Sequence, residues 1–339
     1  MRRLAALLIL GAALLLAACA AKAPAPERAY ADLPRAAYDE SGGGERRPDP
    51  DRRRPAELQF LTAYENETSA PYYPLEGLAG VAYARDGSLY VCDELGGRVH
   101  VWSPAEGAWF QLDSPGSRFY RPVDVHLDGF QAWVLDMDGR ELLRFGPGGS
   151  FLDRLVDFRY LNPGYDHVPV AFDVDVDGSV VVVDPSESMA LLLDSFLGLR
   201  FTVGRPGPHR EQFDAPSGVA FLSDGGFVVS DRGNRRLQRF NRLGTYDGEA
   251  GGADAVGNPL LTPQGVERDV WDNLFVADPA AAAVHVYDAD LRHLFSLGAD
   301  AGLREGPETP IDVAVGPDDL LAVSDRGRGA VLIYRILYQ

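Results

Sequence analysis

Acidic residues recur at one position of a repeating pattern and are the best candidates for chemistry in this chain. Asp124, Asp173 and Glu267 stand where the other copies of the pattern have alanine. His126 and Asp175 each follow one of these acids by two residues, which places their side chains on the same face of an extended strand. Carboxylates gathered with an imidazole are suitable ligands for a divalent cation such as Ca²⁺. The sequence therefore predicts a cation site; the alternative is that the acids line a water-filled channel or face arginines.

Several other kinds of catalysis lack the residues they need. Lys22 is the only lysine and lies outside the repeats, which excludes a P-loop or a Schiff-base lysine from them. The chain contains no G-x-S-x-G, H-E-x-x-H or C-x-x-C motif, so the serine, zinc and thiol chemistries that use these motifs are not indicated. His100 and His285 occupy one equivalent repeat position, which favours a structural role.

The candidate acids are positioned by a repeat of short strands that occurs six times. An aspartate closes the second strand of each copy, at intervals of 43 to 48 residues: Asp93, Asp136, Asp184, Asp231, Asp278 and Asp325. Four short strands in every about 40 to 50 residues are typical of one propeller blade. We therefore predict an all-β fold, a six-bladed β-propeller of four-stranded antiparallel blades. The repeat aspartates are expected to accept hydrogen bonds from loop backbone and to pair with Arg98, Arg140 and Arg236.

The last copy of the repeat lacks its fourth strand. The chain stops at Gln339 after three strands of that copy, while residues 56–66 alternate like a strand and precede the first copy. Pairing this N-terminal strand with the last copy would leave no exposed sheet edge there. We predict that the N-terminal strand closes the ring.

The fourth copy, APSGVAFLSDGGFVVSDRGNRRLQRF, resembles the NHL repeat. The match includes Pro216, Gly218, Val219, Asp231 and Phe240, and the resemblance extends over residues 57–339. The resemblance implies a six-bladed propeller and says little about function. Propellers similar to this family include a peptidyl-hydroxyglycine lyase and calcium lactonases, which hold a metal at the ring centre. A metal-dependent lyase or hydrolase with its site at the central channel is therefore the alternative to a binding protein.

The first residues of the chain are typical of a secreted, lipid-anchored protein. Residues 1–18 have two arginines followed by an apolar run, which indicates a signal peptide. Leu16-Ala17-Ala18-Cys19 resembles the bacterial lipobox, which implies cleavage before Cys19 and lipidation of that residue; ordinary cleavage at an Ala-x-Ala site is the alternative. Residues 19–55 are rich in Ala, Pro, Gly and charge, as expected of a disordered tether to the propeller at 56–339. Since Ala20 follows the cysteine, the lipobox resemblance implies the outer membrane of a Gram-negative bacterium.

Charge limits the classes of partner, and cysteine content limits the possible disulfides. The chain has 32 basic and 50 acidic residues and a net charge of −18, which disfavours nucleic acid and leaves the lipid anchor as the link to the membrane. Cys92 lies inside an apolar strand, where it reads as a small core residue. We expect a monomeric propeller without an intramolecular disulfide.

Aromatic residues and arginines gather in the loops that the repeat places at one face of the ring. Both types are favoured as anchors of binding surfaces, and the predicted binding face consists of Tyr120, Arg121, His167, Arg210, Arg232, Asn234 and Arg326. The alternative is that these side chains pin their own loops or are solvated. Without a catalytic motif, the face favours a non-enzymatic binding platform for an envelope protein, a peptide or a glycan.

Overall fold

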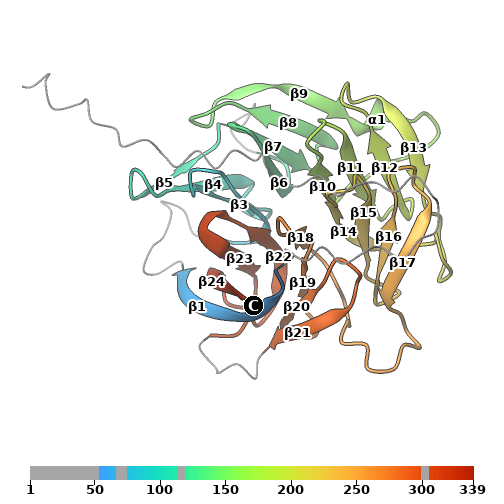
Figure 1. Cartoon of the computed structure of the whole chain (residues 1–339). Coiled ribbons are helices and arrows are strands. Elements are labelled where there is room, and N and C mark those ends of the chain that lie inside the picture. The colour runs from blue at the N-terminus through green and yellow to red at the C-terminus, as the bar shows by residue number, and fades with distance from the viewer. Residues whose placement is uncertain (1–52, 66–74, 114–118, 299–304) are drawn as a thin grey trace, which may run out of the picture. The chain divides into compact units, whose positions relative to one another are not determined.

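The structure is a computed structural model that describes residues 53–65, 75–113, 119–298 and 305–339. These residues form six four-stranded antiparallel sheets arranged as blades around a central axis (Figure 1). The predicted six-bladed β-propeller is confirmed. The predicted signal peptide, Cys19 and nearly all of the tether lie outside the described residues. Within the described ranges, no helix is long and apolar enough to cross a membrane.

Blades 1 to 3 each consist of four strands that are consecutive in the chain. Blade 1 comprises β2 (Leu78–Tyr83), β3 (Leu89–Asp93), β4 (Arg98–Ser103) and β5 (Ala108–Gln111). Blade 2 comprises β6 (Pro122–Asp128), β7 (Gln131–Asp136), β8 (Glu141–Phe145) and β9 (Phe151–Asp157), followed by the short helix α1 (Phe158–Leu161). Blade 3 comprises β10 (Ala171–Val174), β11 (Val180–Asp184), β12 (Met189–Leu193) and β13 (Leu199–Val203).

Blades 4 and 5 repeat this order, and blade 6 combines both ends of the described chain. Blade 4 comprises β14 (Pro216–Phe221), β15 (Phe227–Asp231), β16 (Arg236–Phe240) and β17 (Tyr246–Gly251). Blade 5 comprises β18 (Val266–Arg268), β19 (Leu274–Asp278), β20 (Ala283–Tyr287) and β21 (His293–Gly298). Blade 6 comprises β22 (Pro310–Val315), the 3₁₀ turn η3 (Pro317–Asp319), β23 (Leu320–Asp325), β24 (Ala330–Tyr338) and β1 (Pro55–Glu65).

Tight turns join the first two strands of the blades. Gly178 and Gly225 have φ angles of 82° and 77°, a left-handed conformation that glycine adopts without a steric penalty. These glycines follow Asp177 and Asp224, as the Asp-Gly turns in the sequence predict. The turns fix the register of the paired strands. This register places the apolar side chains of each strand against the neighbouring blade.

The hydrophobic core lies between adjacent blades. Phe227 and Phe240 of blade 4 stack with ring centroids 5.3 Å apart, and both belong to one buried cluster with Val181 and Val183 of blade 3. Burying a side chain of this size contributes about 1.5–3 kcal/mol. Each blade therefore depends on its neighbours for most of its stability.

The repeat aspartates hold the loops that lead into their blades. Asp136 accepts hydrogen bonds from the backbone N–H groups of Tyr120 and Arg121 at 2.8 and 2.7 Å. The predicted pairing with an arginine is seen between Arg236 and Asp231, at 2.8 Å. It is wrong for Arg140, which pairs with Asp166 on a neighbouring loop.

Histidines take the place of an arginine beside other repeat aspartates. His100 lies 3.7 Å from Asp93, and His285 lies 3.5 Å from Asp278. Both pairs are buried. Although burial opposes ionisation, the neighbouring histidine and the hydrogen bonds from loop N–H groups lower the pKa of both aspartates. The shared repeat position of these histidines is therefore structural, as predicted.

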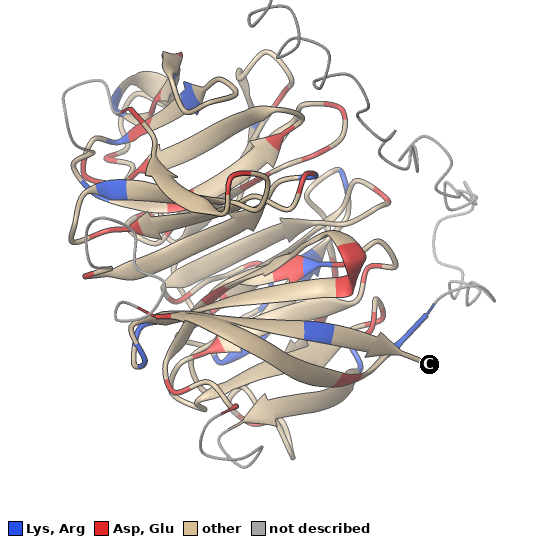
Figure 2. Ribbon diagram, turned by 90° about the vertical axis from the view of Figure 1, so that its left-hand side faces the viewer, with Lys and Arg blue, Asp and Glu red and all other residues tan. Residues whose placement is uncertain are grey.

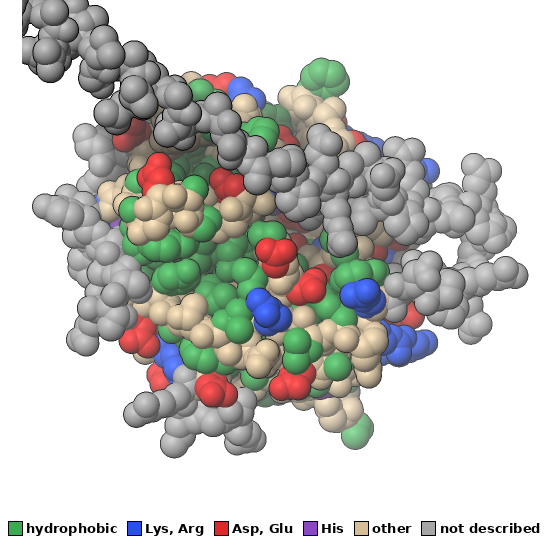
Figure 3. Space-filling model, turned by 60° about the vertical axis from the view of Figure 1, so that its left-hand side comes forward, with side chains coloured by type: hydrophobic (Ala, Val, Ile, Leu, Met, Phe, Trp, Pro, Cys, Tyr) green, Lys and Arg blue, Asp and Glu red, His purple; other side chains and the backbone are tan. Residues whose placement is uncertain are grey.

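The N-terminal strand closes the ring, as predicted. β1 pairs antiparallel with β24, and Leu58 lies opposite Ile336 in that ladder. Tyr64 of β1 also packs against Trp102 and Trp109 of blade 1, with ring centroids 5.5 and 5.7 Å apart. Figure 3 brings this side of the propeller forward and shows hydrophobic side chains gathered among charged ones. β1 thus links the last blade to the first.

This closure predicts how two N-terminal deletions will differ. Removing residues 20–52 should leave the melting temperature unchanged, because β1 remains. Removing residues 20–65 should lower it by about 10 °C or more, since it exposes the edge of β24 and the apolar residues that β1 covers. Thermal unfolding followed by circular dichroism measures both, and equal melting temperatures would contradict closure by β1.

Candidate functional site

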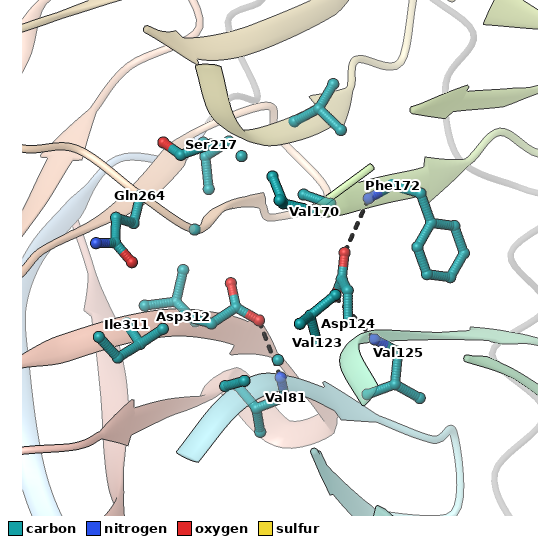
Figure 4. A pocket seen from close by; sticks show the side chains of 18 of the residues that line it. Val81, Val123, Asp124, Val125, Val170, Phe172, Ser217, Gln264, Ile311 and Asp312 are labelled. Carbon is teal, nitrogen blue, oxygen red and sulfur yellow. Dashed lines mark hydrogen bonds between the residues drawn. The ribbon is translucent and has the colours of Figure 1, made fainter. Parts of the chain in front are cut away.

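The innermost strands of the six blades surround a cavity of about 300 Å³ on the propeller axis. A ring of partly exposed side chains from the beginning of these strands projects into it (Figure 4). Three of them are apolar and two are polar: Val123, Val170, Ile311, Ser217 and Gln264. Deeper in the cavity the lining becomes acidic, with carboxyl groups from blades 2, 3, 5 and 6.

The strand register corrects the predicted alignment of the acids. Asp124 lies opposite Leu135, one residue before the repeat aspartate, so it is equivalent to Asp312, which lies opposite Ser324. His126, two residues further along β6, is the true equivalent of Asp173 and Glu267. The alignment took Val123 as the valine before the acid, whereas the register makes Val125 the equivalent of Val219 and Val266. β6 runs on to Asp128 itself, whereas β14 ends well before its turn.

Asp312 is the cavity residue that the sequence analysis missed. The signal was present, because blades 2 and 6 share the pattern Pro-x-Asp-Val where blades 1, 4 and 5 have glycine at the third position. The cavity therefore has two acidic levels. The upper level holds Asp124 and Asp312, and the lower level holds His126, Asp173 and Glu267.

The upper acids bind backbone groups of the next blade. Asp124 accepts a hydrogen bond from the N–H of Phe172 at 2.9 Å, and Asp312 accepts one from the N–H of Val81 at 2.9 Å (Figure 4). Each also packs against a glycine of the preceding blade, where a Cβ on Gly80 or Gly265 would lie within 2.6 or 1.9 Å. A carboxylate has about four acceptor positions, so these contacts leave capacity that faces the cavity.

The lower level contains an ion pair. His126 Nδ1 lies 3.0 Å from Asp173 Oδ1, and the other oxygen of Asp173 accepts a hydrogen bond from the N–H of Phe221 at 2.7 Å. Glu267 accepts a hydrogen bond from the N–H of Arg268 at 2.9 Å. The Asp173 contact fixes His126 Nδ1 and leaves Nε2 as the ring nitrogen available to a ligand.

Burial and neighbouring charges raise the pKa values of several side chains that line the cavity. Burial raises the pKa of Asp312 to about 7, and burial together with the charge of Asp173 raises the pKa of Glu267 to about 7. Burial and the neighbouring Asp312 also raise the pKa of Asp124. For His126, burial acts against the charged form, but the bond to Asp173 prevails and the pKa is raised. Near pH 7 these carboxyl groups can therefore both donate and accept hydrogen bonds.

The structure does not gather the predicted acids into a metal-binding group. Within the described ranges, no group of three or more His, Cys, Asp or Glu residues is placed to hold a metal ion. Asp124, Asp173 and Glu267 direct oxygens at backbone N–H groups. Asp175 is not among the residues that line the cavity, and it accepts a hydrogen bond from the N–H of Val176 at 2.7 Å in the turn of blade 3. A cation site at these residues stays a prediction.

Arginines stand at the mouth of the cavity. Arg121, Arg232 and Arg326 line it together with Glu94. Glu94 pairs with two of them, with Arg121 Nε at 3.2 Å and with Arg326 Nη2 at 2.7 Å. Acidic residues outnumber basic ones in the chain as a whole, and Figure 2 shows both kinds distributed over the blades. Three members of the predicted binding face therefore meet at one opening.

The other members of that face have different environments. Tyr120 is 80% exposed beside Arg121, but Arg210 stacks over Tyr246. Asn234 donates hydrogen bonds to Gly207 and to Asp231 within blade 4.

His167 was misplaced by the sequence analysis. It is fully buried, with Nδ1 2.6 Å from Asp184, so its place in the binding face is wrong. It supplies a buried partner to a repeat aspartate from the loop before blade 3. An aspartate-binding histidine and a surface histidine look alike in sequence.

Comparison with known proteins supports the repeat and the fold. Residues 213–240 match the NHL repeat. A stretch of 113 residues, 33% of this chain, is 27% identical to the human E3 ubiquitin-protein ligase NHLRC1 and spans about a quarter (27%) of that protein.

Solved structures of similar fold include two enzymes and a calcium-binding protein. A gluconolactonase from Xanthomonas campestris has a TM-score of 0.62 at 17% identity, covering 85% of this chain and 96% of its own. A streptogramin B lyase has a TM-score of 0.58 at 10% identity, covering 83% and 97%. The calcium-binding protein regucalcin from Agrobacterium tumefaciens has a TM-score of 0.59 at 15% identity, covering 82% and 95%. At these identities the likeness is one of fold.

The raised pKa of Asp312 predicts a stability that depends on pH. The unfolded aspartate ionises near pH 4, while the folded one keeps its proton up to about pH 7. Stability from this group is therefore complete below about pH 4 and is lost as pH rises through 7. Asp312→Asn keeps an acceptor for Val81, so it should match the wild type at about pH 4 and melt several degrees higher at pH 8. Asp138→Asn, an exposed site, serves as the control, and a pH-independent difference for Asp312→Asn would contradict this account.

Proposed function

We propose that this chain is a ligand-binding propeller, tethered in the cell envelope, that takes a small polar ligand or the end of a peptide or glycan into its central cavity. The observation that carries this proposal is the axial cavity itself. Its volume of about 300 Å³ is at the small end of the range for ligand sites. Its mixed lining of apolar, polar and ionisable side chains is also typical of such sites.

Each level of the cavity has a separate role in this proposal. The apolar side chains Val123, Val170 and Ile311 supply contact area in the ring of partly exposed side chains above the two acidic levels. Gln264 and Ser217 supply hydrogen-bonding groups at the same height. The carboxyl groups below, with pKa values near 7 in Asp312 and Glu267, can match hydroxyl or amino groups of a ligand. A rigid ring of inter-blade contacts keeps these groups in place without a folding step on binding.

A second candidate function is metal-independent acid–base catalysis by the lower level. The specific observation is the pair His126–Asp173 beside Glu267. A histidine oriented by a carboxylate and an acid with a pKa near 7 are suited to accept and donate protons. Lyase and lactonase names occur among the structures of similar fold, and the proposed chemistry would be elimination or ring-opening hydrolysis. In it, Glu267 in its ionised form would take a proton from the ligand or from water, and protonated His126 would return one from Nε2 to the leaving group.

A bulky side chain placed in the cavity should abolish ligand binding there, whereas the same substitution on an exposed turn should not. Val170→Trp places an indole in the cavity, whereas Val176→Trp places one on a turn where Val176 is 95% exposed. In a thermal-shift screen of short peptides, glycan fragments, lactones and hydroxy acids, at least one compound should stabilise the wild type and Val176→Trp but not Val170→Trp. A ligand at about a hundred times its dissociation constant adds roughly 2.7 kcal/mol.

The same screen distinguishes binding from catalysis. Mass spectrometry of each stabilising compound after incubation shows whether it is recovered unchanged, as for a binding protein, or consumed, as for an enzyme. Stabilisation that persists in Val170→Trp would place the ligand elsewhere and contradict the cavity as the site.

The envelope location rests on the lipobox-like Leu16-Ala17-Ala18-Cys19. Lipidation of Cys19 would anchor the protein stably, because each buried methylene contributes about 0.8 kcal/mol. Cys19→Ser should therefore release the protein from the membrane fraction into the soluble periplasm. Fractionation and intact-mass measurement test this, and a membrane-bound Cys19→Ser variant with an unacylated wild type would refute the anchor.

A further inference from the structure

One arginine at the mouth of the cavity has a different environment from its equivalent in another blade. Arg232 and Arg326 each directly follow the repeat aspartate of their blade. Arg326 donates two hydrogen bonds to the carbonyl of Leu78 and pairs with Glu94. Among the described residues, no hydrogen bond or ion pair holds the side chain of Arg232, which is exposed and lines the cavity.

The mouth and the interior of the cavity have opposite charge. Glu94 pairs with Arg121 and Arg326 and not with Arg232, so these three arginines and one carboxylate give the mouth an excess of positive charge. Asp124 and Asp312 lie below it and keep acceptor positions directed at the cavity. The chain has a net charge of −18, so positive charge gathered at one opening above carboxyl groups is opposite in sign to the chain as a whole. Solvation of the surface does not explain this arrangement.

We infer that the ligand is a bipolar small molecule, with an anionic group held by Arg232 at the mouth and an amino group held by Asp124 and Asp312 inside. This inference rests on the proposed binding function of the cavity and adds the chemical class of the ligand. Arginine suits the anion because its guanidinium forms two parallel bonds to a carboxylate or phosphate. An ammonium group suits the interior because it donates three hydrogen bonds and compensates carboxylate charge.

The two charged groups of the site come from different blades. Arg232 follows β15 of blade 4, whereas Asp124 and Asp312 belong to the innermost strands of blades 2 and 6. A ligand that reaches both needs its charges at opposite ends of an extended chain. ε-Aminocaproate, an aliphatic amino acid with its charges at the two ends of a six-carbon chain, is a simple probe of such a ligand.

The experiment compares three probes that share one aliphatic chain. Calorimetric titrations of the full-length protein at low salt would use ε-aminocaproate, caproate, which lacks the amine, and hexylamine, which lacks the acid. In the wild type, ε-aminocaproate should bind at least about ten times more tightly than either other probe. Arg232→Gln should weaken ε-aminocaproate by about five- to ten-fold and leave hexylamine unchanged. Arg210→Gln, an exposed arginine outside the cavity, is the matched control and should change neither.

The outcomes distinguish this inference from the proposed function. Equal affinity for ε-aminocaproate and hexylamine, or no loss in Arg232→Gln, would overturn the role of the mouth while the cavity remained a binding site. Loss of hexylamine binding in Val170→Trp would confirm the cavity independently of the arginine. Failure of all three probes to bind at millimolar concentration would overturn the bipolar ligand, and the screen against Val170→Trp would still decide the proposed function.

Discussion

The free edge of each innermost strand is the constraint on which the centre of this propeller depends. A sheet edge presents N–H groups without strand partners, and six such edges converge on the axis. Blades 2, 3 and 6 each supply a carboxylate that accepts a hydrogen bond from a backbone N–H of the next blade. The donors are the N–H groups of Phe172, Phe221 and Val81. The acids therefore link neighbouring blades at the point where no further strand can be added.

This use of carboxylates gives the centre two properties at once. A buried carboxyl group is costly unless it is well bonded, and the raised pKa values of Asp124, Asp312 and Glu267 reflect that cost. Asp312 and Glu267, with pKa values raised to about 7, remain able to exchange protons near neutral pH. Sites that bind or react commonly retain such locally unfavourable arrangements. The structural and functional interpretations of the acids are thus compatible, because one oxygen can hold the fold while another faces the cavity.

The sequence was sufficient for the fold and insufficient for the site. The repeat aspartates and the unfinished sixth copy predicted six blades and their closure, because both depend on local patterns that recur. Asp124 was assigned to the wrong level because a longer first strand in blade 2 moved the turn, and a shift of two residues keeps a side chain on the same face. His167 was misassigned because burial beside Asp184 depends on a loop path that no pattern encodes. The meeting of Arg121, Arg232 and Arg326 was foreseen only as a shared face, since the distances across a ring depend on all six blades.

The pairing of β1 with β24 has a consequence for how the protein is made. Tyr64 lies opposite Val331, so the last blade joins segments separated by almost the whole domain. Such contacts form slowly because a very long loop must close first. β1 emerges first during synthesis and has no partner until Ala330–Tyr338 has been made. Completion of the ring therefore reports that the chain is whole, and a prematurely terminated chain retains an unpaired strand that proteases and chaperones can detect.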